Sequence, residues 1–208
     1  MIRRRQVLLA PAAVGTLGLV RPTTSRAGAQ LEEPLADPIR SALSAAVSGA
    51  APPKPQFDGA EARLAYLRWL GSTSDRMRRY KSEAHVRQEF LEAVWYESRR
   101  AALETELVLG LIQVESGFRK YAISSAGARG YMQVMPFWAR LIGDGDASRL
   151  FHMQTNLRFG CTILRHYLGI ERGDLFLALG RYNGSRGRSE YPNAVFAARR
   201  RWVVTEPR

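Results

Sequence analysis

The sequence contains little cysteine and histidine and no long apolar run, and each shortage excludes a class of protein. A single cysteine, Cys161, excludes an internal disulfide framework and a cysteine-based zinc site. The three histidines are too scattered to make a metal site, so we expect neither a metal nor an organic cofactor. No uninterrupted apolar run reaches the roughly 18 residues that span a bilayer, so no transmembrane helix is expected.

Acidic residues are also scarce relative to basic ones. The 208 residues include 31 Lys and Arg but only 19 Asp and Glu, which gives a formal net charge of +12. Such an excess favours an anionic partner, either nucleic acid, lipid head groups or an acidic polymer. The composition, with 46% hydrophobic and 24% charged residues, is typical of a globular protein.

Residues 1–29 have the layout of an export signal. Three arginines at positions 3–5 precede a modestly apolar stretch, and Ala27-Gly28-Ala29 fits a cleavage site. A twin-arginine signal and a Sec signal both fit the pattern, and a basic N-terminal arm is the alternative. Cleavage would remove five arginines and no acids, so the net charge would fall from +12 to +7. We expect a periplasmic or cell-envelope protein, and export argues against nucleic acid as the partner.

The rest of the chain divides into a linker and a helical domain. Residues 30–56 are rich in Ala, Ser and Pro, which favours an extended linker, although apolar residues at spacing four allow a short helix around Leu43. Residues 57–204 have helical periodicity, so the predicted class is mainly α. Asp58 and Glu61 predict a capping-box start, and Gly71-Ser72 predicts the end of that first helix. Further helices are predicted over 85–102, 107–116, 136–143, 154–169, 173–181 and 192–203, with at most a small hairpin within 121–133.

Glu115 is the most informative residue. It follows Leu107 to Val114, which is apolar on nearly all sides and is therefore expected to be buried, and it precedes Gly117, a typical helix stop. Burial and the negative end of the helix dipole both raise the pKa of such a carboxyl. A carboxyl that stays protonated near neutral pH can act as a general acid. A solvated glutamate in a frayed last turn is the alternative.

The segment after Glu115 has the features of a ligand-binding loop. Small residues over 124–130 would let a ligand approach the backbone closely. Gln133 offers a donor and an acceptor, and Met135 offers an adaptable apolar surface. A loop with a surface glutamine and a core methionine is the alternative.

Five motifs in order resemble the soluble lytic transglycosylases, which are glycoside hydrolase family 23 and relatives of goose-type lysozyme. The motifs cover roughly residues 86–204: Glu115-Ser116-Gly117-Phe118 with Ala122-Ile123-Ser124, Gly127 to Pro136, Asn156 with Gly160 and Leu164, Tyr182-Asn183, and Tyr191 to Val195. The resemblance implies a lysozyme-like helical domain and peptidoglycan glycan strands as the partner.

The resemblance also implies residue roles. Glu115 matches the single catalytic acid/base, and Ser124, Gln133 and Met135 match residues that line the sugar groove. Tyr182 matches a tyrosine near that glutamate that helps hold the N-acetyl group. Asn183 matches a residue that shapes the loop next to this tyrosine.

Three departures from the family pattern lie at the expected groove. Tyr131 stands where leucine or isoleucine is usual, Arg181 where alanine is usual, and Gly184-Ser185-Arg186 where Ala-Gly-Pro is usual. They bear on substrate length and subsite detail rather than on the reaction. Four aromatic residues are candidates for stacking on sugar faces, with a core role open for the tryptophan: Tyr131, Phe137, Trp138 and Tyr182.

A single carboxyl is enough for cleavage if the sugar supplies its own nucleophile. Residues 116–143 contain no Asp or Glu, so Glu115 has no acidic neighbour in that stretch. The resemblance implies cleavage of the MurNAc-β-1,4-GlcNAc bond with formation of a 1,6-anhydro sugar. A hydrolytic muramidase is one alternative, with Asp144 or Asp146 positioning the water, and a non-catalytic peptidoglycan-binding module is another. The run of arginines at 199–201 is interpreted as a solvated face, with peripheral contact to anionic membrane or wall as the alternative.

Overall fold

The computed structural model describes residues 30–48 and 55–204, so the predicted export signal and most of the Pro-rich run lie outside the described residues. Helices dominate these two ranges. Their bounds are α1 (Asp37–Val47), α2 (Ala60–Met77), α3 (Ala84–Arg100), α4 (Thr105–Ser116), α5 (Pro136–Ile142), the 3₁₀ helix η1 (Ala147–Phe151), α6 (Met153–Ile170), α7 (Leu175–Asn183) and α8 (Glu190–Arg200).

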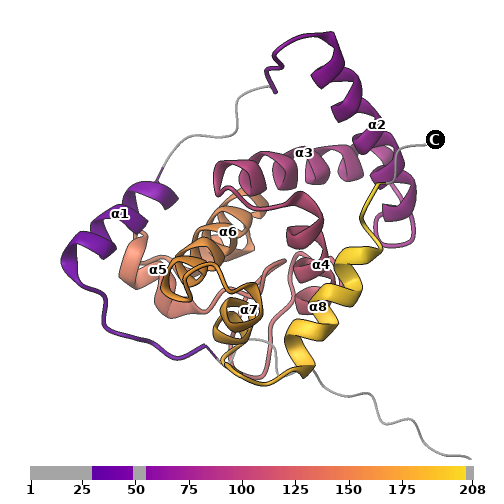
Figure 1. Cartoon of the computed structure of the whole chain (residues 1–208). Coiled ribbons are helices and arrows are strands. Elements are labelled where there is room, and N and C mark those ends of the chain that lie inside the picture. The colour runs from indigo at the N-terminus through magenta and orange to yellow at the C-terminus, as the bar shows by residue number, and fades with distance from the viewer. Residues whose placement is uncertain (1–29, 49–54, 205–208) are drawn as a thin grey trace, which may run out of the picture.

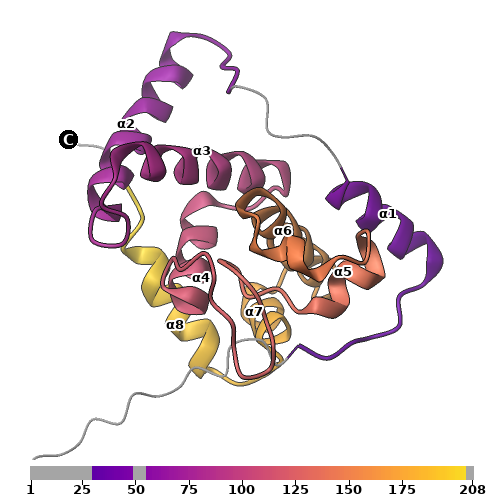
Figure 2. The ribbon, with the colours of Figure 1, turned by 180° about the vertical axis from the view of Figure 1, so that it is seen from behind.

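Helix α4 lies at the centre of the domain, with α3 and α8 packed against it (Figure 1). It occupies this place because it is apolar on all sides, and its residues from Leu107 to Ile112 are buried. The contact with α8 is unusually close, because a Cβ added to Gly110 would lie 2.6 Å from the backbone nitrogen of Arg199. Figure 2 shows the same arrangement from behind, with α6, α7 and α5 on the other side of α4.

The prediction of a mainly α domain is confirmed. Helices α3 to α8 match the six helices predicted from residue 85 onward, with differences of up to three residues at the ends, the largest of them at the end of α8. The predicted hairpin is reduced, in the described ranges, to isolated bridges that pair Arg129 with Ile123 and with Val134. The chain at 121–134 is therefore an ordered loop rather than a sheet.

Both predicted bounds of the first long helix are wrong. Helix α2 begins after Gly59, whose φ of 103° suits glycine, and no side chain caps it, so the capping box does not form. The helix also continues through Gly71-Ser72 as far as Met77. It does so because Thr73 and Met77 have no exposed surface, so the last turns are held by packing.

The first part of the predicted linker packs against the domain. The helix allowed by the apolar spacing forms as α1, which buries Leu43 and contacts α5 and α6. Residues before α1 add three polar contacts: Gln30 with Trp138, Glu32 with Arg140, and Glu33 with Arg181. The boundaries at 29 and 56 themselves stay predictions.

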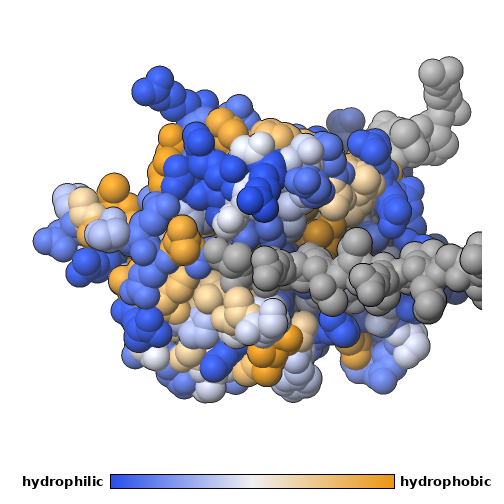
Figure 3. All heavy atoms as spheres, turned by 90° about the horizontal axis from the view of Figure 1, so that it is seen from below, coloured by the Kyte–Doolittle hydropathy of each residue, from blue (hydrophilic) through white to orange (hydrophobic). Residues whose placement is uncertain are grey.

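The described surface is of mixed polarity. On the face seen from below, hydrophobic residues form small patches between hydrophilic ones (Figure 3). No helix within 30–48 or 55–204 is both long and apolar enough to cross a membrane.

Candidate active site

Glu115 lies in the last turn of α4 and is 7% exposed. The helix ends directly after it, because Gly117 takes up a left-handed conformation with φ of 58°. One carboxyl oxygen, Oε1, accepts a hydrogen bond of 2.5 Å from the hydroxyl of Tyr191. The other oxygen, Oε2, is buried and has no hydrogen-bond partner among the described residues. The end of a buried helix therefore holds a carboxyl with one oxygen bonded to Tyr191 and the other buried without a partner among the described residues.

Burial raises the pKa of Glu115 to about 8, and the hydrogen bond from Tyr191 opposes that rise without cancelling it. The direction agrees with the expectation from the sequence. No arginine or lysine bonds to this carboxyl in the described residues, so no cation there offsets its negative charge. The folded structure therefore favours the protonated form of Glu115 near neutral pH.

Tyr191 is the partner of Glu115 that sequence reasoning missed. It stood inside a motif of the resembled family, but no pattern in the sequence indicated that it touches Glu115, 76 residues away. It reaches the carboxyl because α8 packs closely along α4, and it is 7% exposed. Burial and the nearby Glu115 raise the pKa of Tyr191, so its hydroxyl stays protonated as the donor.

The predicted site residue Tyr182 is buried near Glu115, and its role toward a sugar stays a prediction. Its side chain is 1% exposed, and its hydroxyl donates a hydrogen bond of 2.8 Å to the carbonyl oxygen of Met132. Burial and then the charge of Glu115 raise the pKa of Tyr182, so it lies within electrostatic reach of the carboxyl. The contact with Glu115 itself belongs to Tyr191.

The loop after α4 is held by its own polar side chains. Gln133 adopts a positive φ of 49° and donates from Nε2 to the carbonyl oxygens of Ala122 and Gly130, at 3.1 and 2.9 Å. Ser124 accepts a hydrogen bond of 3.1 Å from the backbone nitrogen of Ala128. Both predicted groove residues thus fix the loop, and Met135 lies half-buried at the end of it, where α5 begins.

Helix α6 anchors the same loop through Asn156. Its Oδ1 accepts from the backbone nitrogen of Met132, and its Nδ2 donates to the carbonyl oxygens of Arg129 and Leu150, each at 2.8 Å. Three bonds satisfy the whole amide, which explains why an asparagine stands there. Gly160 also meets this loop, because an added Cβ would lie 2.4 Å from the sulfur of Met132.

Two of the three departures from the family pattern meet at one buried carboxylate. Arg181 donates from Nε to Glu171 at 2.9 Å, and Arg186 donates to both oxygens of Glu171 at 2.7 and 2.8 Å. These bonds, with that of Arg186 foremost, lower the pKa of Glu171 to about 2. The bonds of Arg181 and Arg186 to Glu171 fix the loop beside Asn183. Asn183 itself donates to Ser185 at 3.0 Å, and its buried Oδ1 has no partner among the described residues.

The interpretation of four aromatic residues as sugar-stacking platforms is wrong for this structure. All four lie in the core, with exposed fractions between 1% and 6%: Tyr131, Phe137, Trp138 and Tyr182. Trp138 donates from its ring nitrogen to Gln30 at 2.8 Å, and the ring of Tyr131 packs on that of Phe90.

The candidate second carboxyls are engaged elsewhere. Asp144 pairs with Arg149 and accepts from the backbone of Asp146, which in turn caps η1 at Ser148. Asp144 and Asp146 line a cavity of about 590 Å³ between α1, α5 and α6, and Glu115 does not line it.

No metal or reactive thiol accompanies Glu115 in the described ranges. No group of three His, Cys, Asp or Glu side chains there could hold a metal ion. Cys161 is 1% exposed, and burial raises its pKa, so it is an inert core residue.

These features define a helical domain with one protonated glutamate at the end of its central helix, and comparison with known proteins gives the family. The family described as "Transglycosylase SLT domain" matches residues 92–202. Because this match covers more than half of the chain, the protein belongs to the transglycosylase SLT domain family.

Curated relatives share a shorter stretch. The membrane-bound lytic murein transglycosylase C of Mannheimia succiniciproducens is 46% identical over 52 residues, which are 25% of this chain and 15% of the relative. The protein of the same name from Actinobacillus pleuropneumoniae serotype 5b is 37% identical over 90 residues, which are 39% of this chain and 24% of the relative. The chain thus matches less than a quarter of the length of either relative.

A solved structure also shows a likeness. It is an inactive mutant of the lytic transglycosylase Slt from Pseudomonas aeruginosa, with 20% identity and a TM-score of 0.43. The likeness covers 67% of this chain and 27% of that chain.

Proposed function

We propose that the protein is a peptidoglycan lytic transglycosylase that cleaves the MurNAc-β-1,4-GlcNAc bond without water. The observation that carries the proposal is the surroundings of Glu115: burial raises the pKa of its carboxyl to about 8, and its one hydrogen bond within the described residues comes from Tyr191. The printed names of the curated relatives, lytic murein transglycosylases, agree with this reaction.

In the first step, Glu115 protonates the glycosidic oxygen as the bond to the anomeric carbon breaks. The N-acetyl carbonyl of the same sugar stabilises the positive charge that develops on that carbon. The carboxylate left behind keeps the hydrogen bond from Tyr191, which favours the charged form. Tyr191 thus acts as a positioning residue that stabilises Glu115 after its proton has gone.

In the second step, the Glu115 carboxylate takes a proton from the 6-hydroxyl of the sugar. That oxygen then bonds to the anomeric carbon, which closes the 1,6-anhydro ring. One C–O bond breaks, one forms, and Glu115 regains its proton, so neither water nor a second carboxyl is needed. The tethered hydroxyl also reacts at an effective concentration several powers of ten above that of an untethered group.

The loops around Glu115 supply the groove in this proposal. Ser124 and Gln133 hold one loop, Met135 lies at its end, and Tyr182 links the loop to α7. The Oδ1 of Asn183 is buried and has no partner among the described residues, so an N–H group of the sugar would satisfy it only if the loop at Ser185 moved. Peptidoglycan as substrate places the protein in the cell envelope, and export by the signal at 1–29 would bring it there.

Mass analysis of the products from purified cell wall tests the proposal. We expect mainly 1,6-anhydromuramyl fragments, which are lighter by one water than hydrolytic fragments and carry no new reducing end. Mainly reducing muramic ends would instead show a muramidase, and binding without any cleavage would show a glycan-binding module.

A further inference from the structure

We propose that a basic strip beside Glu115 binds the free carboxylates of the peptides carried by the glycan strand. The strip consists of Arg79, Lys81, Arg119 and Lys120. This proposal rests on the proposed function only in its choice of polymer, because it concerns binding and not cleavage.

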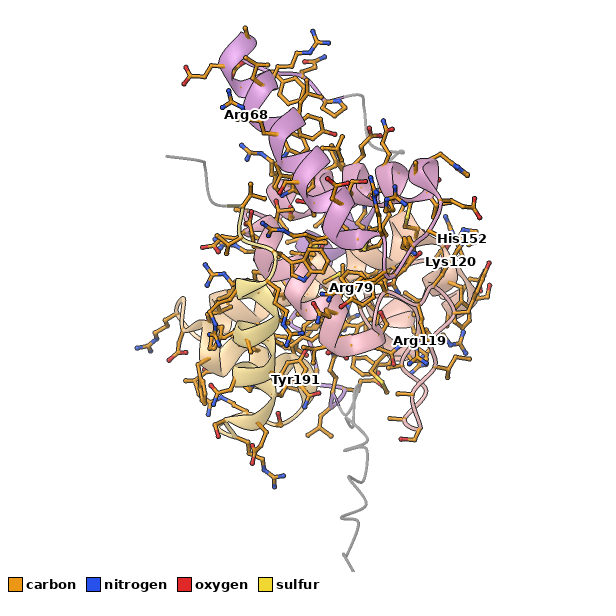
Figure 4. The ribbon with its side chains drawn as sticks, turned by 90° about the vertical axis from the view of Figure 1, so that its right-hand side faces the viewer. Arg68, Arg79, Arg119, Lys120, His152 and Tyr191 are labelled. Atoms are coloured by element: carbon orange, nitrogen blue, oxygen red, sulfur yellow. The ribbon has the colours of Figure 1, made fainter. Side chains whose placement is uncertain are left out.

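The strip is assembled from two segments that meet at Phe118. Arg119 and Lys120 follow Glu115 by four and five residues, at the end of α4. Arg79 and Lys81 lie between α2 and α3 and reach the same place because the rings of Tyr80 and Phe118 pack with centroids 4.6 Å apart. Figure 4 shows Arg79, Arg119 and Lys120 on one side of the molecule, with Tyr191 on the same side.

Lys81 is the anchor of the strip. Its ammonium donates to the hydroxyl of Tyr131 at 2.9 Å and to the carbonyl oxygen of Phe118 at 3.4 Å. It also lies over the rings of Phe90 and Tyr131, at 5.0 and 4.7 Å from their centroids. The departure at position 131 therefore has a role, because leucine or isoleucine has no oxygen to hold this lysine.

The charges of the strip are not neutralised within the described residues. None of its four cations forms an ion pair there, whereas other surface arginines such as Arg78 and Arg140 do. Burial, followed by the charge of Lys120, lowers the pKa of Lys81, so like charges already act on one another. Arg79, Arg119 and Lys120 are exposed, and Lys81 is half-buried.

A polymer bound at Glu115 would pass this strip. Peptides on muramic acid carry carboxylates. A strand in the groove would therefore bring negative charges next to four cations that have no ion-pair partner among the described residues. Exposed Tyr121 and Ile123 continue the same segment, with exposed fractions of 71% and 65%, and offer apolar contact to the sugars or the peptide. The position next to the acid favours the substrate over a membrane surface as the occupant.

The test measures binding of soluble glycan chains to full-length Glu115→Gln protein, so that turnover does not interfere. Three ligands are compared: chains with free peptide carboxylates, the same chains after methylamidation, and chains stripped of peptides. We expect the chains with free carboxylates to bind about tenfold more tightly at low salt, and the difference to shrink as salt rises.

Charge reversal with a matched control gives the second arm. Arg79→Glu with Lys120→Glu should abolish the preference for free carboxylates, and Arg79→Ala with Lys120→Ala should reduce it. Arg63→Glu with Arg68→Glu makes the same change in net charge at exposed positions on α2, and should leave the preference intact. Melting temperatures confirm that each variant is folded.

Three results would overturn the proposal. The first is equal binding of the free and the amidated chains by the Glu115→Gln protein without charge reversal. The second is an equal loss of the preference for free carboxylates in the strip variant and in the control variant. The third is tighter binding to anionic phosphatidylglycerol vesicles than to the glycan chains, if charge reversal in the strip weakens the binding to vesicles as well. The last result would assign the strip to a membrane surface. None of these results bears on whether wall is cleaved, so failure of this proposal is distinct from failure of the proposed reaction.

Discussion

Two buried glutamates on neighbouring helices have opposite surroundings. Glu97 on α3 has no exposed surface, and Glu115 on α4 is 7% exposed. Glu97 accepts from Arg158 at 2.9 and 3.0 Å, from Gln154, and from Arg100 at 3.5 Å. Within the described residues, Glu115 accepts a hydrogen bond from the hydroxyl of Tyr191 alone.

The comparison shows that burial alone does not make a carboxyl reactive. Arginines at Glu97 compensate its charge and use its oxygens, so it ties α3 to α6 as a structural group. Among the described residues, no arginine or lysine bonds to Glu115, and one of its oxygens has no partner. The surroundings therefore favour the protonated carboxyl. The neighbours decide which of two similar side chains can do chemistry.

The largest effect should come from breaking the structural pair. Glu97→Ala removes the acceptor shared by Arg158, Gln154 and Arg100, and should lower the free energy of unfolding by about 3–5 kcal/mol. Such a loss is a large fraction of the stability of an ordinary domain. Urea denaturation measures it. Glu97→Leu with Arg158→Leu should recover a substantial part of the loss, and an unchanged midpoint for Glu97→Ala would mean that the pair does not stabilise the fold.

Glu115→Gln should have the opposite effect to Glu97→Ala, because it should lower activity and not stability. The rate of wall cleavage should fall at least about a hundredfold, because the variant can neither donate nor accept the proton. Its stability should equal or exceed that of the wild type. Near-normal turnover by a folded Glu115→Gln protein would contradict the assignment of the acid.

The pH dependence of the same pair of proteins sharpens the contrast. Folded Glu115 keeps its proton up to about pH 8, whereas the unfolded residue releases it near pH 4.5. The folded state therefore binds more protons between these values, and the stability of the wild type falls as pH rises through them. Glu115→Gln lacks this loss, so its advantage in melting temperature should grow from about pH 4.5 to about pH 8.

The smallest effect should come from the two tyrosines, and it should separate them. Tyr191→Phe removes the bond that lowers the pKa of Glu115, so the alkaline limb of the rate profile should move to higher pH and the rate should fall about tenfold. Tyr182→Phe leaves the carbonyl of Met132 without its donor, so it should cost about 1–3 kcal/mol of stability with a smaller shift of the profile. Equal shifts in both profiles would mean that the bond to Tyr191 is not what sets the pKa.

The sequence predicted the helices and the burial of Glu115 well, because both rest on local pattern. The apolar run before Glu115 indicated a buried helix, and Gly117 indicated its end, which together place the carboxyl. The partner Tyr191 could not be predicted by such reasoning, since it depends on how α8 crosses α4. The burial of Glu97 was missed for a related reason. Glu97 continues the apolar face of Phe90 and Val94, but only the packing of α6 shows that Arg158 pairs with it there.

Other errors have the same origin. Gly71 reads as a helix stop, yet Met77 buries its side chain and extends α2 past it. The Ala-rich segment around Leu43 reads as a linker, yet its first part packs on α5 and α6. Tertiary contacts outweigh local propensity at these positions, and they are visible only when distant segments meet.

The close approach at Gly110 has a consequence for how loss of activity should be interpreted. Glu115 and Tyr191 belong to two helices that touch backbone to backbone at that glycine, so its size sets the spacing of the pair. A random mutagenesis screen scored by wall lysis would therefore flag position 110 as essential, although no atom there meets the substrate. The loss of activity on substitution of Gly110 would reflect a changed alignment of α4 and α8 and not a role in the reaction. Gly110 should therefore not be counted among the catalytic residues.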